Sequence, residues 1–263
     1  MSALPAVRVE MDGPVTTILM SRPETRNAVD GPMAAALLKA FEGFEADASQ
    51  RVAVLHGEHG NFCSGADLSA LSDPERAHVL DADGGPPGPM GPTRMALSKP
   101  LIAAVAGYAV AGGLELSLLA DLRVAEESAT FGVFCRRWGV PLIDGGTVRL
   151  PRVVGMGRAL DMILTGRAVG AREAFEMGLV NRVTPDGTAR SAAEKLAHEI
   201  AAFPQECLLT DRASAYRQWF LPLAEALREE GRYGAPIVAR EGLAGAKAFV
   251  AGAGRGGRAA EAG

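Results

Sequence analysis

Two glycine turns are the segments of this sequence best suited to chemistry on a carbonyl group. One lies in FCSGADL and the other in VAGGLEL, and in each an apolar run leads into glycine and then into an expected helix. Such junctions present backbone N–H groups that have no partner within the helix, and glycine lets a ligand approach the backbone closely. If both turns face one carbonyl oxygen, each N–H would stabilise a developing oxyanion by roughly 3–4 kcal/mol.

Glu115 follows the second turn within one helical turn, and its charge argues against a phosphate loop. The G-x-G-x-x-G spacing of dinucleotide-binding proteins is also absent there. A carboxylate beside a polarised carbonyl can instead move a proton at the neighbouring carbon. The residues alone leave a second interpretation open, in which the glycines serve helix–strand packing and Glu115 favours a helix N-terminus.

Composition and charge exclude several classes of protein. The 263 residues are 48% hydrophobic and 22% charged, which is enough for a substantial core. The formal net charge of -4 gives no basic field for nucleic acid or an anionic membrane. No apolar run of about 20 residues occurs. The three cysteines fit neither a disulfide framework nor a zinc site, so each is expected to be a small buried residue in a reducing, cytoplasmic setting. They are Cys63, Cys135 and Cys207.

The elements around the two turns predict an α/β fold with parallel strands. Alternation around Asp12-Gly13 predicts a β-hairpin, and residues 30–47 have the spacing of a helix. Because short buried strands then alternate with helical runs, right-handed crossovers between parallel strands are expected. The strands are expected at 51–58, 101–107 and 122–127, and the buried helix at 114–122.

Three further segments complete the predicted organisation. Residues 60–71 begin as a turn and resemble the start of another helix, and residues 72–95 are rich in Gly, Pro and Asp, as in a surface loop or a partly ordered lid. After Gly178 the pattern is helical. These features predict a core domain over residues 1–190 that carries the site, followed by a helical region over residues 191–263.

The sequence resembles the enoyl-CoA hydratase/isomerase, or crotonase, family. The motifs that carry the resemblance stand in family order and spacing; they are FCSGADLSAL, KPLIAAVAGYAVAGGLELSLLADLRVA, ATFG and GGTVRLPRVVG. The resemblance implies a ClpP-like spiral of ββα units with a C-terminal helical trimerisation region, and it implies a homotrimer or a dimer of trimers. It also implies acyl-CoA thioester substrates, with coenzyme A arriving as part of the substrate and no separate cofactor or metal.

The resemblance also assigns roles to particular residues. The oxyanion hole would consist of the amides of Ala66 and Gly112, and the alanine in Ala111-Gly112-Gly113, where many members have a third glycine, falls on the flanking position. Asp67 is also expected to cap the helix that follows it, whereas Lys99 is expected to be structural. The residues implied to bind coenzyme A are Arg26, Ser64, Ala66, Asp67 and Leu68.

The catalytic acids differ from the family pattern at one position. Glu115 matches the first of two glutamates that hydratases use to hold and activate water, but the second falls at Cys135. Asp144, in VPLIDGGTVRL, resembles the aspartate of dienoyl-CoA isomerases and naphthoate synthases, and would supply the second carboxylate. The alternative for Asp144 is the N-cap of the following helix.

These residues favour an enoyl-CoA hydratase that adds water to a 2-enoyl-CoA through an enolate. An enoyl-CoA or dienoyl-CoA isomerase is the first alternative, because a lone glutamate suits a 1,3-proton shift. A thioester hydrolase and an inactive acyl-CoA-binding homologue also stay open. A nucleophilic Cys135 would need a base, and none of the four histidines lies in a segment resembling a family site. Phe134 and Trp138 are expected to line the acyl pocket.

Overall fold

The predicted β-hairpin opens the structure, a computed structural model that describes residues 5–252. β1 (Val7–Asp12) and β2 (Val15–Met20) pair antiparallel, with Asp12 opposite Val15 across Gly13. The remaining strands of this six-stranded sheet are parallel to β2 and follow in the order β3, β4, β6 and β9. Their bounds are Val52–Gly57, Leu101–Val105, Leu122–Glu126 and Arg182–Thr184.

A second sheet consists of three short strands. β5 (Tyr108–Val110) pairs parallel with β7 (Thr130–Gly132), which pairs antiparallel with β8 (Val169–Gly170). Gly107, at φ +50, lies between β4 and β5. A strand of the first sheet is therefore followed by a strand of the second sheet and then by helix α2 (Gly112–Leu119). This is one ββα unit of the predicted spiral.

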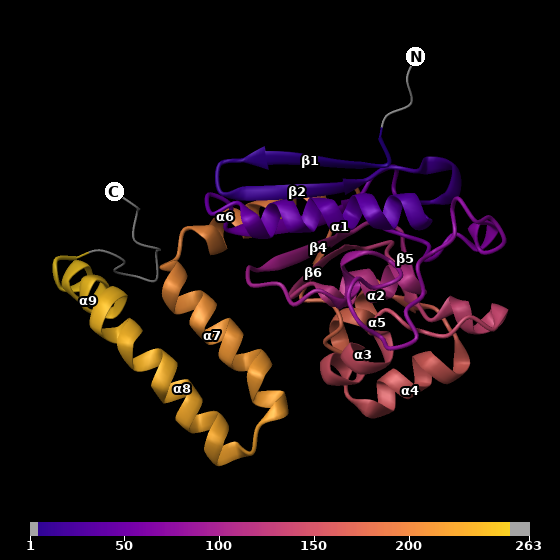
Figure 1. Ribbon diagram of the computed structural model, residues 1–263. Helices are drawn as coiled ribbons and strands as arrows, with labels where there is room; N and C mark the ends of the chain where they lie inside the picture. Colours follow the sequence, from indigo (N-terminus) through magenta and orange to yellow (C-terminus); the bar gives the residue numbers. More distant parts are fainter. Residues whose placement is uncertain (1–4, 253–263) are drawn as a thin grey trace. The chain divides into compact units, whose positions relative to one another are not determined.

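Helix α1 (Gly31–Ala46) packs against the hairpin strands (Figure 1). Asp30 begins the helix by accepting a hydrogen bond from the Met33 amide at 3.0 Å. Its buried face includes Leu37 and Phe41, which lie one helical turn apart. Lys99 Nζ donates to two carbonyl oxygens at the C-terminal end of the helix, each at 2.7 Å. Its role here is therefore structural, as predicted.

Helices also precede Gly178, among them the one predicted to follow Asp144. α3 (Gly146–Val154), α4 (Met156–Thr165) and α5 (Ala171–Glu176) lie between β7 and β9. The pattern after Gly178 was predicted to be helical, but the strand β9 comes before the first helix there. That strand has three residues, which are too few to display an alternating pattern.

The structure corrects the prediction for residues 60–71 and shows which part of the glycine- and proline-rich segment, residues 72–95, is buried. Residues 60–71 contain only a short 3-10 turn, Leu68–Ala70, so the helix predicted there was wrong. Asp67 nevertheless caps that turn by accepting from the Ser69 amide at 3.1 Å. In the glycine- and proline-rich segment, residues 79–84 are exposed and residues 88–93 are buried. A second 3-10 turn, Pro92–Arg94, lies at its end.

The chain divides into two compact units, Met1–Ala197 and His198–Gly263. The boundary predicted near residue 190 falls inside α6 (Ala189–Ala201). In the second unit, Glu241 accepts hydrogen bonds from the Glu206 and Cys207 amides at the start of α7, and Cys207 is exposed rather than buried as expected. The helices there are α7 (Gln205–Arg217), α8 (Leu223–Ile237) and α9 (Leu243–Val250), with a π-helical stretch Val238–Gly242 before α9. No helix within residues 5–252 is long and apolar enough to cross a membrane.

Candidate active site

The two glycine turns, Glu115 and Asp144 line one cavity of about 570 Å³. Most of the coenzyme A-binding residues predicted from the sequence line it too, namely Arg26, Ser64, Ala66 and Leu68. Apolar side chains make up much of the remaining wall, among them Leu71, Leu80, Met90, Val110, Val140 and Ile143. An apolar cavity with a few convergent polar groups is the usual form of a small-molecule site.

The amides of Ala66 and Gly112 are free to bind a ligand oxygen. In the first turn, the backbone hydrogen bonds are made by the two neighbours of Ala66. Val29 N donates to Gly65 O at 2.9 Å, and Asp67 N donates to Val29 O at 2.7 Å. Gly112 is the first residue of α2, where amides have no intrahelical partner. Within residues 5–252, neither amide donates a hydrogen bond to a protein group.

The glycines bring the two turns into direct contact. A Cβ placed on Gly65, which has φ +103, would lie 3.1 Å from Gly112 N, so the two turns adjoin each other. A Cβ on Gly113 would lie 2.0 Å from Cys63 O, and that contact excludes any larger residue. Packing thus requires these glycines, as the alternative interpretation held, and the same packing places the two turns together.

Ala111 has a backbone conformation that favours glycine. Its φ of 53° and ψ of -124° lie outside the regions that L-residues ordinarily adopt. Its side chain is buried in the core. The third-glycine position of the family motif therefore keeps its glycine-like conformation in this chain although its residue is alanine.

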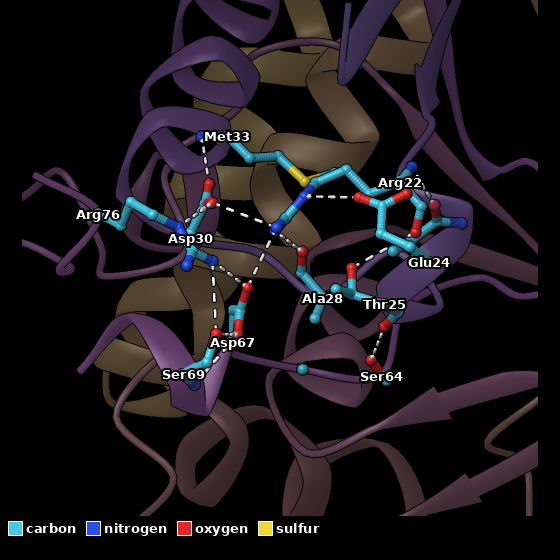
Figure 2. A network of polar contacts seen from close by, with 12 residues as sticks. Arg22, Glu24, Thr25, Ala28, Asp30, Met33, Ser64, Asp67, Ser69 and Arg76 are labelled. Carbon is cyan, nitrogen blue, oxygen red and sulfur yellow. Dashed lines mark hydrogen bonds and ion pairs between the residues drawn. The ribbon is translucent and has the colours of Figure 1, made fainter. Parts of the chain in front are cut away.

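A network of charged groups holds the first turn (Figure 2). Asp67 Oδ2 lies 3.1 Å from Arg22 and 2.6 Å from Arg76, and both arginines also lie 3.3 Å from Asp30 Oδ2. Arg22 further donates to Ala28 O at 2.6 Å. Both carboxylates are about one-tenth exposed or less. Asp67 is not among the residues that line the cavity, and its side chain holds the turn.

Glu115 is buried, and its carboxyl group is fixed by two backbone amides. Its Oε1 accepts from Asp144 N at 2.9 Å and from Gly146 N at 2.8 Å. A Cβ on Gly146 would lie 2.9 Å from that oxygen, so a larger residue there would displace the Glu115 carboxyl group. Burial first, and the negative charge of Asp144 in addition, raise the pKa of Glu115 to about 7 although the two amides oppose the shift. Such a carboxyl group can act as an acid or a base at neutral pH.

Asp144 lies beside Glu115 and does not cap the helix that follows it. The N-cap of α3 is Gly145, at φ +96, so the capping alternative was wrong. Asp144 Oδ1 instead accepts from Met90 N at 2.9 Å and from the Thr93 hydroxyl. Arg149 donates to Thr93 O and to Asp144 O. The aspartate is thereby held in the wall of the cavity, with one carboxylate oxygen engaged by two donors.

Cys135 lines the same cavity, at the position where the family pattern has a second glutamate. Burial raises the pKa of its thiol, and the negative charge of Glu115 raises it further. The thiol therefore stays protonated at neutral pH, which opposes the nucleophilic role considered above. Phe134 and Trp138 line the cavity from the same 3-10 turn, and Trp138 is largely exposed.

The predicted coenzyme A residues lie together at the first turn. The Arg26 guanidinium stacks over the Tyr108 ring, 5.5 Å from its centroid. Ser64 donates its hydroxyl proton to Thr25 O at 2.9 Å, and its amide donates to Arg26 O at 3.1 Å. Arg26 and Tyr108 thus line the same cavity as Ala66, and a guanidinium is well suited to bind an anionic ligand arm.

Several residues of the site were not identified from the sequence, among them Tyr108, His78, Met90 and Thr93. Tyr108, His78 and Met90 line the cavity, and Thr93 holds Asp144. Three of them lie in the glycine- and proline-rich segment, whose irregular backbone has no periodicity from which an inward-facing residue could be inferred. Within the described part of the chain, no cluster of three or more metal-ligating side chains occurs.

Ala66, Gly112 and Glu115, the last with a raised pKa, line one cavity together. This is the combination that the sequence predicts for an enzyme that stabilises an oxyanion and transfers a proton. Residues 10–237 match the family model described as enoyl-CoA hydratase/isomerase, and the chain belongs to that family. The predicted crotonase fold is thereby confirmed.

Individual relatives agree with this assignment. The chain is 39% identical over 205 residues to an enoyl-CoA hydratase of Mycobacterium tuberculosis, covering 75% of each chain. It is 36% identical over 249 residues to a probable enoyl-CoA hydratase of Rhizobium meliloti, covering 92% of this chain and 94% of the relative. A crystal structure of an enoyl-CoA hydratase from M. tuberculosis superposes with a TM-score of 0.87 at 34% identity, covering 94% of this chain and 96% of the other.

Proposed function

We propose that this protein is an enoyl-CoA hydratase that adds water to the double bond of a 2-enoyl-CoA. The observation that carries the proposal is the position of Glu115, which lines the same cavity as the free amides of Ala66 and Gly112. The names of the relatives and of the family point to the same reaction. The site residues assigned from the sequence are part of this proposal.

The proposed reaction passes through an enolate. The thioester oxygen accepts hydrogen bonds from Ala66 N and Gly112 N, which stabilise the negative charge that develops there. Glu115, as a carboxylate, takes a proton from water while the water oxygen bonds to the β-carbon, and the double-bond electrons move toward the thioester oxygen. Glu115 then returns that proton to the α-carbon as the carbonyl re-forms. Every atom of water ends in the product.

Asp144 is the proposed second carboxylate. Its Oδ1 is occupied by Met90 N and Thr93, which leaves Oδ2 to orient the attacking water. In this role it replaces the glutamate that the family pattern would place at Cys135. The coenzyme A arm would lie along Arg26, Ser64 and Leu68 and enters as part of the substrate, so no separate cofactor is proposed. We place the reaction in the cytoplasm.

An isomerase that moves a double bond is the second candidate, and Cys135 is the observation that favours it. Without a second glutamate, a single carboxyl group of pKa about 7 suits removal of a proton at one carbon and its return at another. A thioester hydrolase is less well supported, since the protonated Cys135 thiol supplies no nucleophile.

Mass spectrometry of short and medium enoyl-CoA thioesters in heavy water distinguishes these activities. A hydratase adds one water and incorporates deuterium at the α-carbon, whereas an isomerase exchanges deuterium or moves the double bond without a gain of water. A hydrolase releases free coenzyme A. Glu115→Gln keeps the acceptor for both amides but cannot transfer a proton, so it should lose the activity. Intact, unlabelled thioesters bound by the wild-type protein would contradict the proposal and leave an inactive acyl-CoA-binding homologue.

A further inference from the structure

The carboxylate of Asp144 is held by the protein through one oxygen only. Its Oδ1 accepts from Met90 N at 2.9 Å and from the Thr93 hydroxyl. Its Oδ2 has no hydrogen-bond partner among residues 5–252, and it is not among the unpartnered side-chain atoms there that are shielded from solvent. Because Asp144 lines the cavity, Oδ2 is the oxygen that a bound molecule can contact.

Burial directs the side chain of Thr93 to this carboxylate. Thr93 belongs to the 3-10 turn Pro92–Arg94 and is 0% exposed. A hydroxyl group has a single proton to donate, and here Asp144 Oδ1 accepts it. A Cβ placed on Gly88 would lie 2.1 Å from Thr93 Oγ1 and 3.0 Å from Asp144 Oδ1. The Gly88 backbone therefore packs directly against the hydrogen-bonded pair.

Arg149 ties together the backbones of the two partners. Its guanidinium donates to Thr93 O at 2.7 Å and to Asp144 O at 3.0 Å, although these residues are 51 positions apart in the chain. With both backbones fixed in this way, the direction of the Asp144 carboxylate depends on the two donors to Oδ1. Of these, the Thr93 hydroxyl is the one that a substitution can remove.

Glu115 is held by different groups. Its Oε1 accepts from the backbone amides of Asp144 and Gly146, and neither bond involves Thr93. Loss of the Thr93 hydroxyl should therefore release the Asp144 side chain while the two amides keep Glu115 in place. In the proposed reaction the two carboxylates have separate tasks, since Glu115 transfers the proton and Asp144 orients the attacking water.

We infer that Thr93 is a positioning residue for the addition of water, and that its hydroxyl fixes the Asp144 carboxylate so that Oδ2 faces the attacking water. The inference rests on the proposed function, in which Asp144 is the second carboxylate. Without the hydroxyl, the carboxylate can turn about its side-chain bonds, because Met90 N alone is left to hold Oδ1. A misplaced water slows its addition even when the proton-transferring group is intact.

Two reactions separate the addition of water from the transfer of a proton. Hydration of a 2-enoyl-CoA requires both. Exchange of the α-hydrogen of a saturated acyl-CoA in heavy water requires only Glu115 and the oxyanion amides. In the exchange, Glu115 removes the α-hydrogen as a proton, the thioester oxygen takes the negative charge, and a deuteron that Glu115 has acquired from the solvent returns to the α-carbon.

Thr93→Val keeps the shape of the side chain and removes the hydroxyl. Its kcat for hydration should fall about tenfold to a hundredfold, with a much smaller change in KM. The rate of α-hydrogen exchange, followed by mass spectrometry, should fall far less, and it also reports that the variant is folded. Thr93→Ser is the matched control, because it keeps the hydroxyl and loses a methyl group, so it should restore most of the hydration rate.

A double-mutant cycle with Asp144→Ala gives an independent measurement. If Thr93 acts through the Asp144 carboxylate, Thr93→Val should lower kcat for hydration in the wild-type background and cause little further loss in Asp144→Ala. Losses that multiply in the double variant would overturn the inference, because Thr93 would then act independently of Asp144. Hydration by Asp144→Ala at the wild-type rate would overturn it as well.

The remaining outcomes distinguish the inference from the proposed function. If the wild-type protein hydrates 2-enoyl-CoA and Thr93→Val does so equally well, the inference is wrong and the proposed function stands. Equal losses of hydration and exchange in Thr93→Val, or a Thr93→Ser variant as slow as Thr93→Val, would assign Thr93 to the packing of the fold. A wild-type protein that hydrates no 2-enoyl-CoA contradicts the proposed function and, with it, the inference.

Discussion

At the scale of single residues, the proposed chemistry depends on the surroundings of Glu115. Two amides hold one carboxyl oxygen, and Gly146 permits their close approach. Burial nevertheless outweighs these hydrogen bonds and raises the pKa of Glu115 to about 7. A glutamate in water would be almost fully ionised at that pH, so the protein environment, and not the residue type, allows Glu115 to accept and return a proton.

The rate of hydration should depend on the ionisation of Glu115. Because the carboxylate form must accept a proton from water, kcat/KM should rise with pH up to about 7 and then level off. The pH profile with a 2-enoyl-CoA measures this. Asp144→Asn removes a charge that raises the Glu115 pKa, so the residual activity of this variant should have its acid limb at lower pH. An unchanged limb in Asp144→Asn would assign it to another group.

Glu115 should also lower stability at alkaline pH. Its folded-state pKa is raised from 4.5 to about 7, so the folded protein binds more protons than the unfolded chain between these values. The stability that the proton confers is therefore complete below pH 4.5 and lost as pH rises through about 7. Glu115→Gln, which keeps an acceptor for both amides, should be more stable than wild type at pH 8 by up to roughly 3 kcal/mol. Urea unfolding at pH 8 and pH 4 measures the difference, which should disappear at pH 4.

At the scale of elements, two turns must be held against each other. The first turn is held through Asp67 by Arg22 and Arg76, which also bind Asp30 at the start of α1. The second turn follows β5 and opens α2 at Gly112. Glycine at positions 65 and 113 allows the contact between the turns. The positions of the two amides therefore depend on groups outside the cavity.

Asp67→Asn should weaken the oxyanion site although Asp67 does not line the cavity. The substitution removes the charge that pairs with Arg22 and Arg76, both of which would face a neutral amide. We expect a loss of stability of about 1–3 kcal/mol and a fall in kcat that exceeds the change in KM. Unfolding and steady-state kinetics measure these effects, with the exposed Asp83→Asn as a control for charge. Equal effects in both variants would contradict a positioning role.

Ala111→Gly should relieve the backbone at the second turn. Ala111 lies at φ 53°, where an L-residue costs of order 1 kcal/mol or more. The added freedom of glycine in the unfolded chain offsets about 0.4–1 kcal/mol of that gain. A small net stabilisation is therefore expected in thermal unfolding, with activity retained. A clear loss of stability would mean that the buried methyl group contributes more than the strain.

At the scale of the whole molecule, the chain consists of two compact units. The first unit holds the two sheets and the cavity, and the second is helical. The helical unit carries large apolar side chains that are exposed in the isolated chain, and an exposed apolar surface of this kind is typical of an interface. These side chains include Trp219, Phe220, Leu223, Leu227, Leu243 and Phe249.

We expect the chain to assemble through these side chains into a trimer or a dimer of trimers. Sedimentation equilibrium should then give a mass three or six times 27.3 kDa. Phe220→Asp would place a charge on a side chain that is 76% exposed in the isolated chain, and it should reduce the mass. The neighbouring change Gln218→Glu is a matched control. A wild-type protein that sediments as a monomer at micromolar concentration would contradict the expectation.

The sequence by itself determined the hairpin, the parallel strands and the buried helix, because periodicity and turn residues are local properties of the chain. Its motifs determined the family. Its motifs also placed Glu115, Ala66, Gly112 and Asp144 in one cavity, although their catalytic roles stay predictions. Only the tertiary structure decided that Asp144 is held by Thr93 and does not cap α3, and that one ring nitrogen of His78 is buried without a partner among residues 5–252. The first depends on a contact between segments distant in sequence, and the second on contacts within an irregular segment. No local pattern in the sequence encodes such contacts.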